Sequence, residues 1–150
     1  MEEAAQLSLD NLQSGEGGPF GAVVVKGGRI IARGNNRVTS TNDPTAHAEV
    51  VAIREACRLL GTFDLRGCEL YTSCEPCPMC LGAIYWARFD KVYFANTRHD
   101  AADAGFDDAL IYQEIEKPLA QRKLPMEHFP NEKARAVFWR WKEKQNKIHY

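Results

Sequence analysis

The stretch Thr45-Ala46-His47-Ala48-Glu49 places an imidazole and a carboxylate two residues apart, where a helix is expected to begin. A second stretch, Glu75-Pro76-Cys77-Pro78-Met79-Cys80, supplies two cysteines at CxxC spacing, also at the start of an expected helix. One imidazole and two thiolates suit zinc, and three protein ligands leave one position for water, as in catalytic zinc sites. The sequence therefore predicts a catalytic zinc ion held by His47, Cys77 and Cys80.

Glu49 is expected beside this zinc site and not among its ligands. It follows His47 by two residues, so on a helix the two side chains point in different directions. Its predicted role is to take the proton of the metal-bound water and deliver it to the substrate and then to the leaving group. A solvated carboxylate in the first turn of a helix is the alternative for Glu49. For Cys77 and Cys80 the alternatives are a zinc-ribbon half-site, which would need a second CxxC, or a pair of buried thiols.

The segments outward from the two motifs alternate between strand and helix patterns. Gly27-Gly28 is a hairpin signal that makes the first two strands antiparallel, whereas helices between the later strands favour parallel pairing. Residues 34–36 suggest a bulge or a change of direction, and residues 39–43 and 96–108 are expected to be loops. The resulting fold class is α/β: a three-layer α/β/α sandwich with a mixed central sheet. Helices are expected over residues 1–14, 45–60, 76–88, 109–115 and 131–147, and strands over residues 20–25, 29–33, 68–72 and 91–95.

Length and composition favour one globular domain over residues 1–150. Hydrophobic residues make up 45% and charged residues 26% of the chain, an ordinary globular balance. The formal net charge of −1 argues against a nucleic-acid partner, because nucleic-acid binders usually carry a basic excess. No apolar run approaches the roughly 20 residues that cross a bilayer, and the acidic Met1-Glu2-Glu3-Ala4 is unlike a secretory signal. We therefore expect no membrane association and a cytoplasmic location, where the crowded cysteines favour metal binding over disulfides and Cys74 is a buried thiol.

The two motifs and their surroundings resemble a known family. His47-Ala48-Glu49 together with Pro76-Cys77-Pro78-Met79-Cys80 matches the signature of zinc nucleobase deaminases. The chain resembles the cytidine deaminase-like fold and, within it, the bacterial guanine deaminases. The zinc motif is specific only for the superfamily, whereas Tyr85-Trp86, the Ala-Gly-Phe-Asp-Asp run and Tyr150 indicate guanine. The similar segments are residues 18–23, 42–49, 72–88 and 104–108.

This resemblance implies hydrolysis of guanine to xanthine and ammonia, with one Zn²⁺ per chain. A zinc-bound hydroxide would attack carbon 2 while Glu49 shuttles protons. The implied substrate-binding residues are an amide that hydrogen-bonds the purine, two aromatic rings that bracket it and two residues that complete the pocket: Asn36; Phe20 and Trp86; Asp108 and Tyr150. Aromatic faces bind a purine, a carboxylate accepts from its N–H groups, and an amide can donate or accept. Resembling proteins also dimerise, so a homodimer is expected, with exchanged C-terminal segments as one form and residues 131–150 closing an active site.

Several alternatives stay open at this level. Phe20 and Trp86 are also compatible with plain core, Asn36 with a turn, Asp108 with the N-cap of the helix at Ala109, and Tyr150 with a frayed terminus. A related deaminase acting on ammeline, cytosine or tRNA adenosine is the nearest rival function. From a different class, the chain could be a structural zinc module that binds a protein through the aromatic residues of its last helix, Phe138, Trp139 and Trp141.

Overall fold

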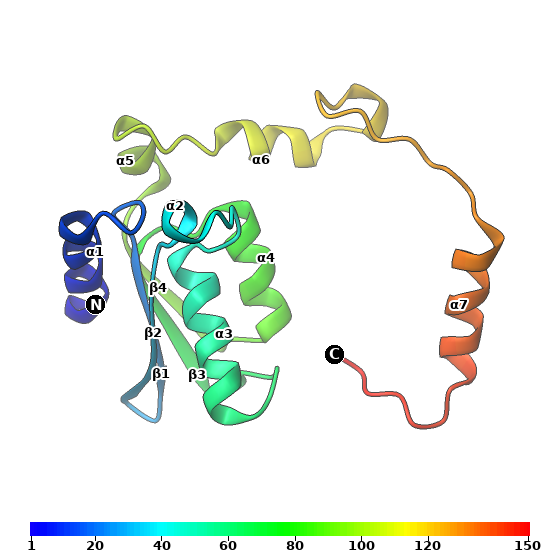
Figure 1. Ribbon diagram of the computed structural model, residues 1–150, viewed down its shortest axis with the longest axis horizontal. Helices are drawn as coiled ribbons and strands as arrows, with labels where there is room; N and C mark the ends of the chain where they lie inside the picture. The colour runs from blue at the N-terminus through cyan, green and yellow to red at the C-terminus, as the bar shows by residue number, and fades with distance from the viewer. The chain divides into compact units, whose positions relative to one another are not determined.

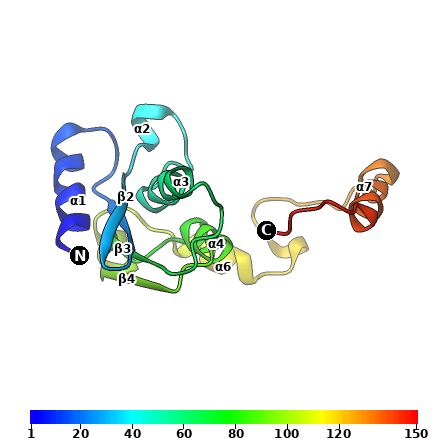
Figure 2. The ribbon, with the colours of Figure 1, turned by 90° about the horizontal axis from the view of Figure 1, so that it is seen from below.

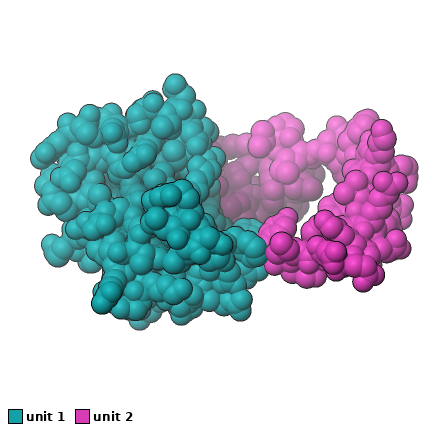
Figure 3. Space-filling model, turned by 60° about the horizontal axis from the view of Figure 1, so that its bottom comes forward, with its two compact units in different colours: residues 1–109 teal, residues 110–150 magenta.

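A computed structural model describes residues 1–150 and divides them into two units, Met1–Ala109 and Leu110–Tyr150 (Figure 3). The first unit contains every strand and the two metal-binding motifs. The second contains most of α6 and all of α7. None of the helices is long and apolar enough to cross a bilayer.

The first unit is built on a four-stranded sheet in the order β2-β1-β3-β4. β1 pairs antiparallel with β2 and with β3, whereas β3 and β4 are parallel. α1 covers one face of the sheet, and α3 and α4 cover the other (Figures 1 and 2). The predicted three-layer sandwich with a mixed sheet is thus confirmed. The elements are α1 Glu2–Ser14, β1 Gly21–Lys26, β2 Arg29–Asn35, α3 Ala48–Leu60, β3 Cys68–Cys74, α4 Pro78–Ala87 and β4 Lys91–Asn96.

The β1–β2 hairpin turns where it was expected but carries its irregularity elsewhere. Gly27 and Gly28 have φ of 55° and 75°, and two successive positive φ values match the twist of a tight hairpin. Of the two alternatives for residues 34–36, the bulge is wrong, because β2 continues in register through Asn35. The change of direction is correct, since β2 ends at Asn35 and α2 begins at Val38. The extra residue is Ile31, since Val24 pairs with Ala32 and Val25 with Ile30. A one-residue insertion of this kind sharpens the strand twist without an obvious sequence signal.

Small residues bring α3 close to the sheet. Ala48, Ala52 and Ala56 are fully buried on the face of α3 that meets the sheet. A Cβ at Gly34 of β2 would overlap the backbone of α3 at Ala48 and Ala52, so only glycine permits this approach. The start of α3, which carries the first metal-binding motif, is therefore held against the end of β2.

Two segments expected to be loops contain short helices. α2 spans Val38–Thr41, and α5 spans Arg98–Asp103. α5 begins with a capping box, in which Thr97 and Asp100 each accept a hydrogen bond from the other's backbone N–H. The composition of residues 96–108 obscured this Thr-x-x-Asp signal.

The second unit has helical structure with no buried residue on α6 or α7. α6 spans Ala109–Glu116 from the boundary between the units, a 3₁₀ turn spans Leu119–Gln121, and α7 spans Glu132–Glu143. Asn131 caps α7, since its Oδ1 accepts from the Ala134 N–H at 3.0 Å. α7 ends earlier than the expected residue 147, because Lys144 leaves helical geometry with ψ of 119°. The single-domain organisation, with residues 131–150 closing an active site, stays a prediction.

Candidate metal centre and active site

The ends of two neighbouring helices bring the metal-binding motifs together. His47 is the N-cap of α3 and Cys77 is the N-cap of α4, each with extended ψ of 154° and 167°. Both expected helices therefore begin slightly later than predicted, at Ala48 and Pro78. Pro78 suits the first helical position because its fixed φ is already helical and its missing N–H is not needed there. Since α3 and α4 pack on the same face of the sheet, two positive helix ends meet where thiolates are expected.

The three predicted zinc ligands form one cluster. His47 Nδ1 lies 3.6 Å from Cys77 Sγ and 3.5 Å from Cys80 Sγ, and all three donor atoms lie within 4.8 Å of one another. A tetrahedral zinc with ordinary bond lengths would hold a nitrogen and a sulfur roughly 3.6 Å apart. The spacing and the chemistry of the donors thus fit zinc, and they identify Nδ1 as the imidazole ligand atom.

The contacts within the cluster favour the thiolate form of Cys77. Hydrogen bonds from the Cys80 thiol and from His47 lower the pKa of Cys77 to about 4. The bond to Cys77 is also the main cause that raises the pKa of His47. The pKa of Cys80 is raised, first by its contact with Cys77 and then by burial. Metal binding needs deprotonated cysteines, and a zinc ion would favour the thiolate form of both.

Glu49 lies beside the donors and outside the ligand cluster. Its side chain is 6% exposed, and its Oε2 lies 3.5 Å from Cys80 Sγ. Burial raises the pKa of the Glu49 carboxyl, and the neighbouring Cys77 thiolate adds to the increase. A carboxyl with a raised pKa can hold a proton and release it again near neutral pH. The solvated alternative for Glu49 is therefore wrong.

Asn36 and Phe20 lie close together where β2 ends and β1 begins. The Asn36 N–H donates to the Phe20 carbonyl at 3.1 Å. Asn36 is 6% exposed, and its Oδ1 accepts from the backbone N–H groups of Gly18 and Val38 at 3.2 and 3.1 Å. The Asn36 oxygen thus bridges the loop before β1 and the first residue of α2. The Phe20 ring meets Phe106 edge to face, with centroids 4.9 Å apart.

The remaining predicted site residues are spread more widely. Asp108 lies near enough to Cys77 for the thiolate to raise its pKa, although burial is the larger cause. Asp107 Oδ1 accepts from the Ala109 N–H at 2.8 Å, and Asp108 directly precedes α6. Both alternatives for Asp108, a pocket residue and the N-cap of α6, stay predictions. Tyr150 lies in the second unit. Its role stays a prediction.

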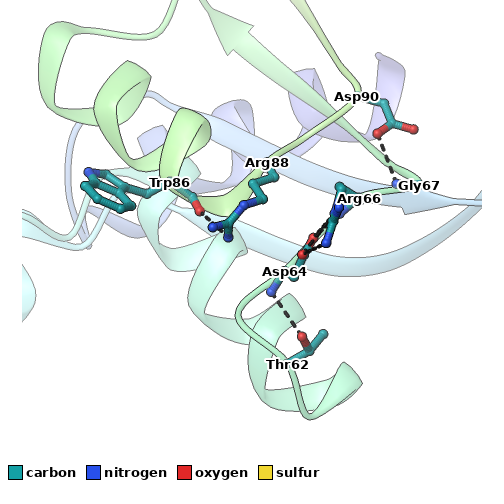
Figure 4. Close-up of polar contacts among 7 residues, drawn as sticks. All are labelled: Thr62, Asp64, Arg66, Gly67, Trp86, Arg88 and Asp90. Atoms are coloured by element: carbon teal, nitrogen blue, oxygen red, sulfur yellow. Dashed lines mark hydrogen bonds and ion pairs between the residues drawn. The ribbon is translucent and has the colours of Figure 1, made fainter. Parts of the chain in front are cut away.

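Trp86 lies at the opposite end of α4 from the zinc ligands. It follows Cys80 by six residues, or about 9 Å along the helix axis. Its side chain is 66% exposed, which rules out a core position in this chain. Figure 4 shows its ring pointing away from Arg88, whose guanidinium donates to the Trp86 carbonyl at 3.5 Å. The bracketing of a purine by Phe20 and Trp86 stays a prediction.

Sequence reasoning missed Phe106 and Asn11. Phe106 stood inside the 104–108 run without a role, although it is the aromatic residue that meets Phe20. Asn11 is 1% exposed and donates to backbone carbonyls of Gly18 and Asn36 at 2.6 and 2.9 Å. The sequence did contain a signal for Asn11. It follows Ala4 by seven residues, so both lie on the same face of the first helix, where a buried apolar residue is expected.

A groove of about 780 Å³ lies away from these residues, between β2 and α3. Its lining includes four arginines, and three of them form ion pairs at 3.5 Å or less with neighbouring carboxylates. It contains none of the predicted site residues. A smaller cavity of about 90 Å³ lies beside Phe20, Cys74 and Phe106. The donor cluster, and not the size of a groove, therefore marks the active site.

Known proteins share this site and this fold. Residues 1–96 match the cytidine and deoxycytidylate deaminase zinc-binding region. The chain is 53% identical over 150 residues to guanine deaminase of Bacillus subtilis (strain 168). The aligned region covers 100% of this chain and 96% of that protein. The X-ray structure of guanine deaminase from Bacillus subtilis superimposes with a TM-score of 0.96 at 54% identity, covering 99% of this chain and 95% of that one.

A second group of relatives is less similar. Over 116 residues the chain is 41% identical to a tRNA-specific adenosine deaminase of Aquifex aeolicus (strain VF5), covering 77% of this chain and 74% of that protein. The deaminase match spans the metal-binding motifs, and the likeness over the full length is to guanine deaminase. This chain therefore belongs to the zinc-dependent cytidine deaminase superfamily and, within it, to the guanine deaminase family.

Proposed function

We propose that this chain hydrolyses guanine to xanthine and ammonia. The observation that carries the proposal is the similarity to guanine deaminase over the whole length of both chains, since the metal site alone is common to the superfamily. The structure supports the reaction type independently, because a buried carboxyl lies beside a three-donor zinc site.

His47, Cys77 and Cys80 hold the zinc. When bound, the ion supplies a Lewis acid that lowers the pKa of a coordinated water to about 7. Glu49 takes one proton of the attacking water and delivers it to ring N3 as the water oxygen bonds to carbon 2. Glu49 then moves the remaining hydroxyl proton to the 2-amino group. The carbon–nitrogen bond breaks, the carbonyl of xanthine forms, and ammonia leaves.

Asn36, Phe20 and Asp108 are proposed to hold the purine. Both hydrogen bonds to the Asn36 carboxamide described above use its oxygen, so Nδ2 is the part that can donate to a purine acceptor. Phe20, steadied by Phe106, offers a ring to the purine face. Asp108 accepts from a ring N–H. Because Trp86 lies toward the other end of α4, we propose that it contributes to the outer edge of the pocket.

A substrate screen tests this assignment. Ammonia release is measured with guanine, guanosine, adenine, cytosine, ammeline and a tRNA anticodon stem-loop that carries adenosine. We expect guanine to give the highest kcat/KM and guanosine to fail, because a ribose on N9 would collide with a closed pocket. Preference for the stem-loop would move the chain to the tRNA deaminases. Zinc content without ammonia from any of these compounds would favour the structural zinc module.

We also propose a homodimer in the cytoplasm. α4 is apolar all round, yet only Cys80, Ile84 and Ala87 on it are buried. Its outer face exposes Tyr85, at 77%, and Trp86. Exposed apolar patches of this kind usually mark an interface. A second copy is the proposed partner, with exchanged C-terminal segments as one form.

Sedimentation equilibrium at micromolar concentration is expected to give the mass of a dimer. Tyr85→Asp should weaken the dimer, because it would bury an unpaired charge in the interface. Glu116→Asp, a substitution in the second unit that keeps the charge, serves as the control. A monomeric mass for the parent protein would contradict the proposed interface.

Deleting residues 148–150 is expected to lower kcat/KM for guanine by roughly tenfold or more, with little change in the melting temperature. The reason is that the proposed role of Tyr150 is to close a pocket, and terminal segments that close over a substrate contribute to the reaction more than to folding. Steady-state kinetics and thermal unfolding of the same preparation measure both. Unchanged kcat/KM in the shortened chain would exclude this role for Tyr150.

A further inference from the structure

We propose that Asn11 is a positioning residue for purine recognition, which sets the placement of both Asn36 and Phe20. The inference rests on the proposed function, because Asn36 and Phe20 are the proposed purine contacts. Asn11 lies on α1, on the opposite face of the sheet from the helices whose N-caps carry zinc ligands. It therefore touches neither metal nor substrate, and its effect must pass through the residues it holds.

One side chain ties three backbone and side-chain groups together. The two N–H bonds of the Asn11 amide are used by the carbonyls of Gly18 at 2.6 Å and of Asn36 at 2.9 Å. Its Oδ1 accepts from Asn35 Nδ2 at 2.6 Å. With 1% exposure, water cannot replace these bonds. Asn11 thus joins the loop before β1 to the end of β2.

The same contacts reach the Asn36 side chain through Gly18. While the Gly18 carbonyl accepts from Asn11, the Gly18 N–H donates to Asn36 Oδ1 at 3.2 Å. A Cβ at the adjacent Gly17 would overlap both Asn36 O and Oδ1, so the loop lies directly against this amide. The Val38 N–H also donates to this oxygen, at 3.1 Å, so the loop that Asn11 anchors supplies one of the two hydrogen bonds that orient the Asn36 carboxamide and the direction of Nδ2.

Phe20 depends on the same anchor. The Phe20 N–H donates to the Gly18 carbonyl at 2.8 Å, so this carbonyl accepts from both Phe20 and Asn11. The ring also packs on Gly18, where a Cβ would lie 3.1 Å from it. Loss of the Asn11 hydrogen bonds should thus displace the aromatic face and the amide donor together.

Asn11→Asp is the most informative substitution. Aspartate has nearly the same shape as asparagine, but it replaces the two N–H donors of Nδ2 by an oxygen that faces the Gly18 and Asn36 carbonyl oxygens. Misplacement of binding groups by about 1 Å can cost up to about 10²-fold. We expect guanine affinity and kcat/KM to fall roughly ten- to hundredfold. The zinc content should stay at one ion per chain, because none of the metal donors contacts this network.

The test measures guanine affinity by calorimetry in Glu49→Gln protein, which should bind guanine without turning it over. Asn11→Asp, Asn36→Ala and the double variant are compared in this background, with zinc content and melting temperature recorded for each. Gln6→Ala is the matched control, because Gln6 is an amide on the same helix whose side chain bonds only the exposed Asp10, at 2.7 Å. If Asn11 acts through Asn36, the double variant will lose much less affinity than the product of the two single losses.

Unchanged affinity in Asn11→Asp, or losses that multiply in the double variant, would overturn the inference. Should Asn11→Asp not fold, Asn11→Ala, which removes all three hydrogen bonds, is judged by the same criteria. Failure of the proposed function has a different signature. In that case the parent protein releases no ammonia from guanine and its Glu49→Gln form binds none, whatever residue stands at position 11.

Discussion

Glu49→Gln is expected to reduce kcat on guanine by roughly 10²- to 10⁴-fold, the range in which positioned proton transfer contributes to enzyme reactions. The buried carboxyl is the group proposed to move both protons of the attacking water, and an amide cannot do so. Its Oε2 lies 3.5 Å from Cys80 Sγ, so glutamine fills the same space beside the zinc site. Zinc content and the melting temperature should therefore stay close to those of the parent protein.

Steady-state kinetics, metal analysis and thermal unfolding check this result. Glu55→Gln is the matched control, since Glu55 lies on the same helix and its side chain is exposed in a pair with Arg58. Exposed pairs contribute little to stability, and this one is far from the metal donors. Near-normal turnover in Glu49→Gln would exclude the proton-shuttle role even if zinc were shown to be essential.

Zinc removal is expected to abolish deamination and to lower the melting temperature by roughly 10–20 °C. A bound ion would join His47 and Cys77, which are the N-caps of α3 and α4, to Cys80. A metal present at 1,000 times its Kd stabilises the folded state by about 4 kcal/mol. Dialysis against a strong chelator, followed by calorimetry and the ammonia assay, measures both effects.

The same loss should follow from replacing one ligand. Cys77→Ser should lower the bound zinc to well below one ion per chain and remove activity, because a hydroxyl is a much weaker zinc ligand than a thiolate. Cys57→Ser is the control, since Cys57 is a half-buried thiol outside the donor cluster. Restored activity on adding zinc to the chelated protein would show that the metal, and not refolding damage, is responsible. Full activity after zinc removal would contradict a catalytic metal.

Most of the fold could be predicted from local patterns. The glycine pair at residues 27–28 determined the hairpin, and the helices between later strands determined parallel pairing of β3 and β4. The local irregularities of the fold could not be predicted from these patterns. The bulge at Ile31 is a shift in the pairing of β1 with β2 that neither strand's residue pattern signals. α5 lies in a segment whose alanine and aspartate content masked its capping box.

The candidate site divides in the same way. His47, Cys77 and Cys80 could be assigned from the sequence because ligand type and spacing follow directly from zinc chemistry, and each motif opens a helix. The sequence could not show whether the Asn36 side chain donates to the purine or accepts from it, because an amide can do both until its other partners are known. A local hydrogen bond from Val38 and a tertiary one from Gly18 occupy the Asn36 oxygen and leave the amide nitrogen, Nδ2, to donate.

The sequence by itself thus determined the reaction chemistry. It identified the three zinc ligands, the carboxylate of Glu49 beside them, and a helix start at each motif. Only the tertiary structure decided how the purine contacts are supported. Phe20 is steadied by Phe106, 86 positions later, and Asn36 is oriented through a loop held by Asn11. The physical reason is that ligand identity depends on residue type, which is local. The direction of a side chain depends on hydrogen bonds between segments that are distant in sequence and become neighbours only when the chain has folded.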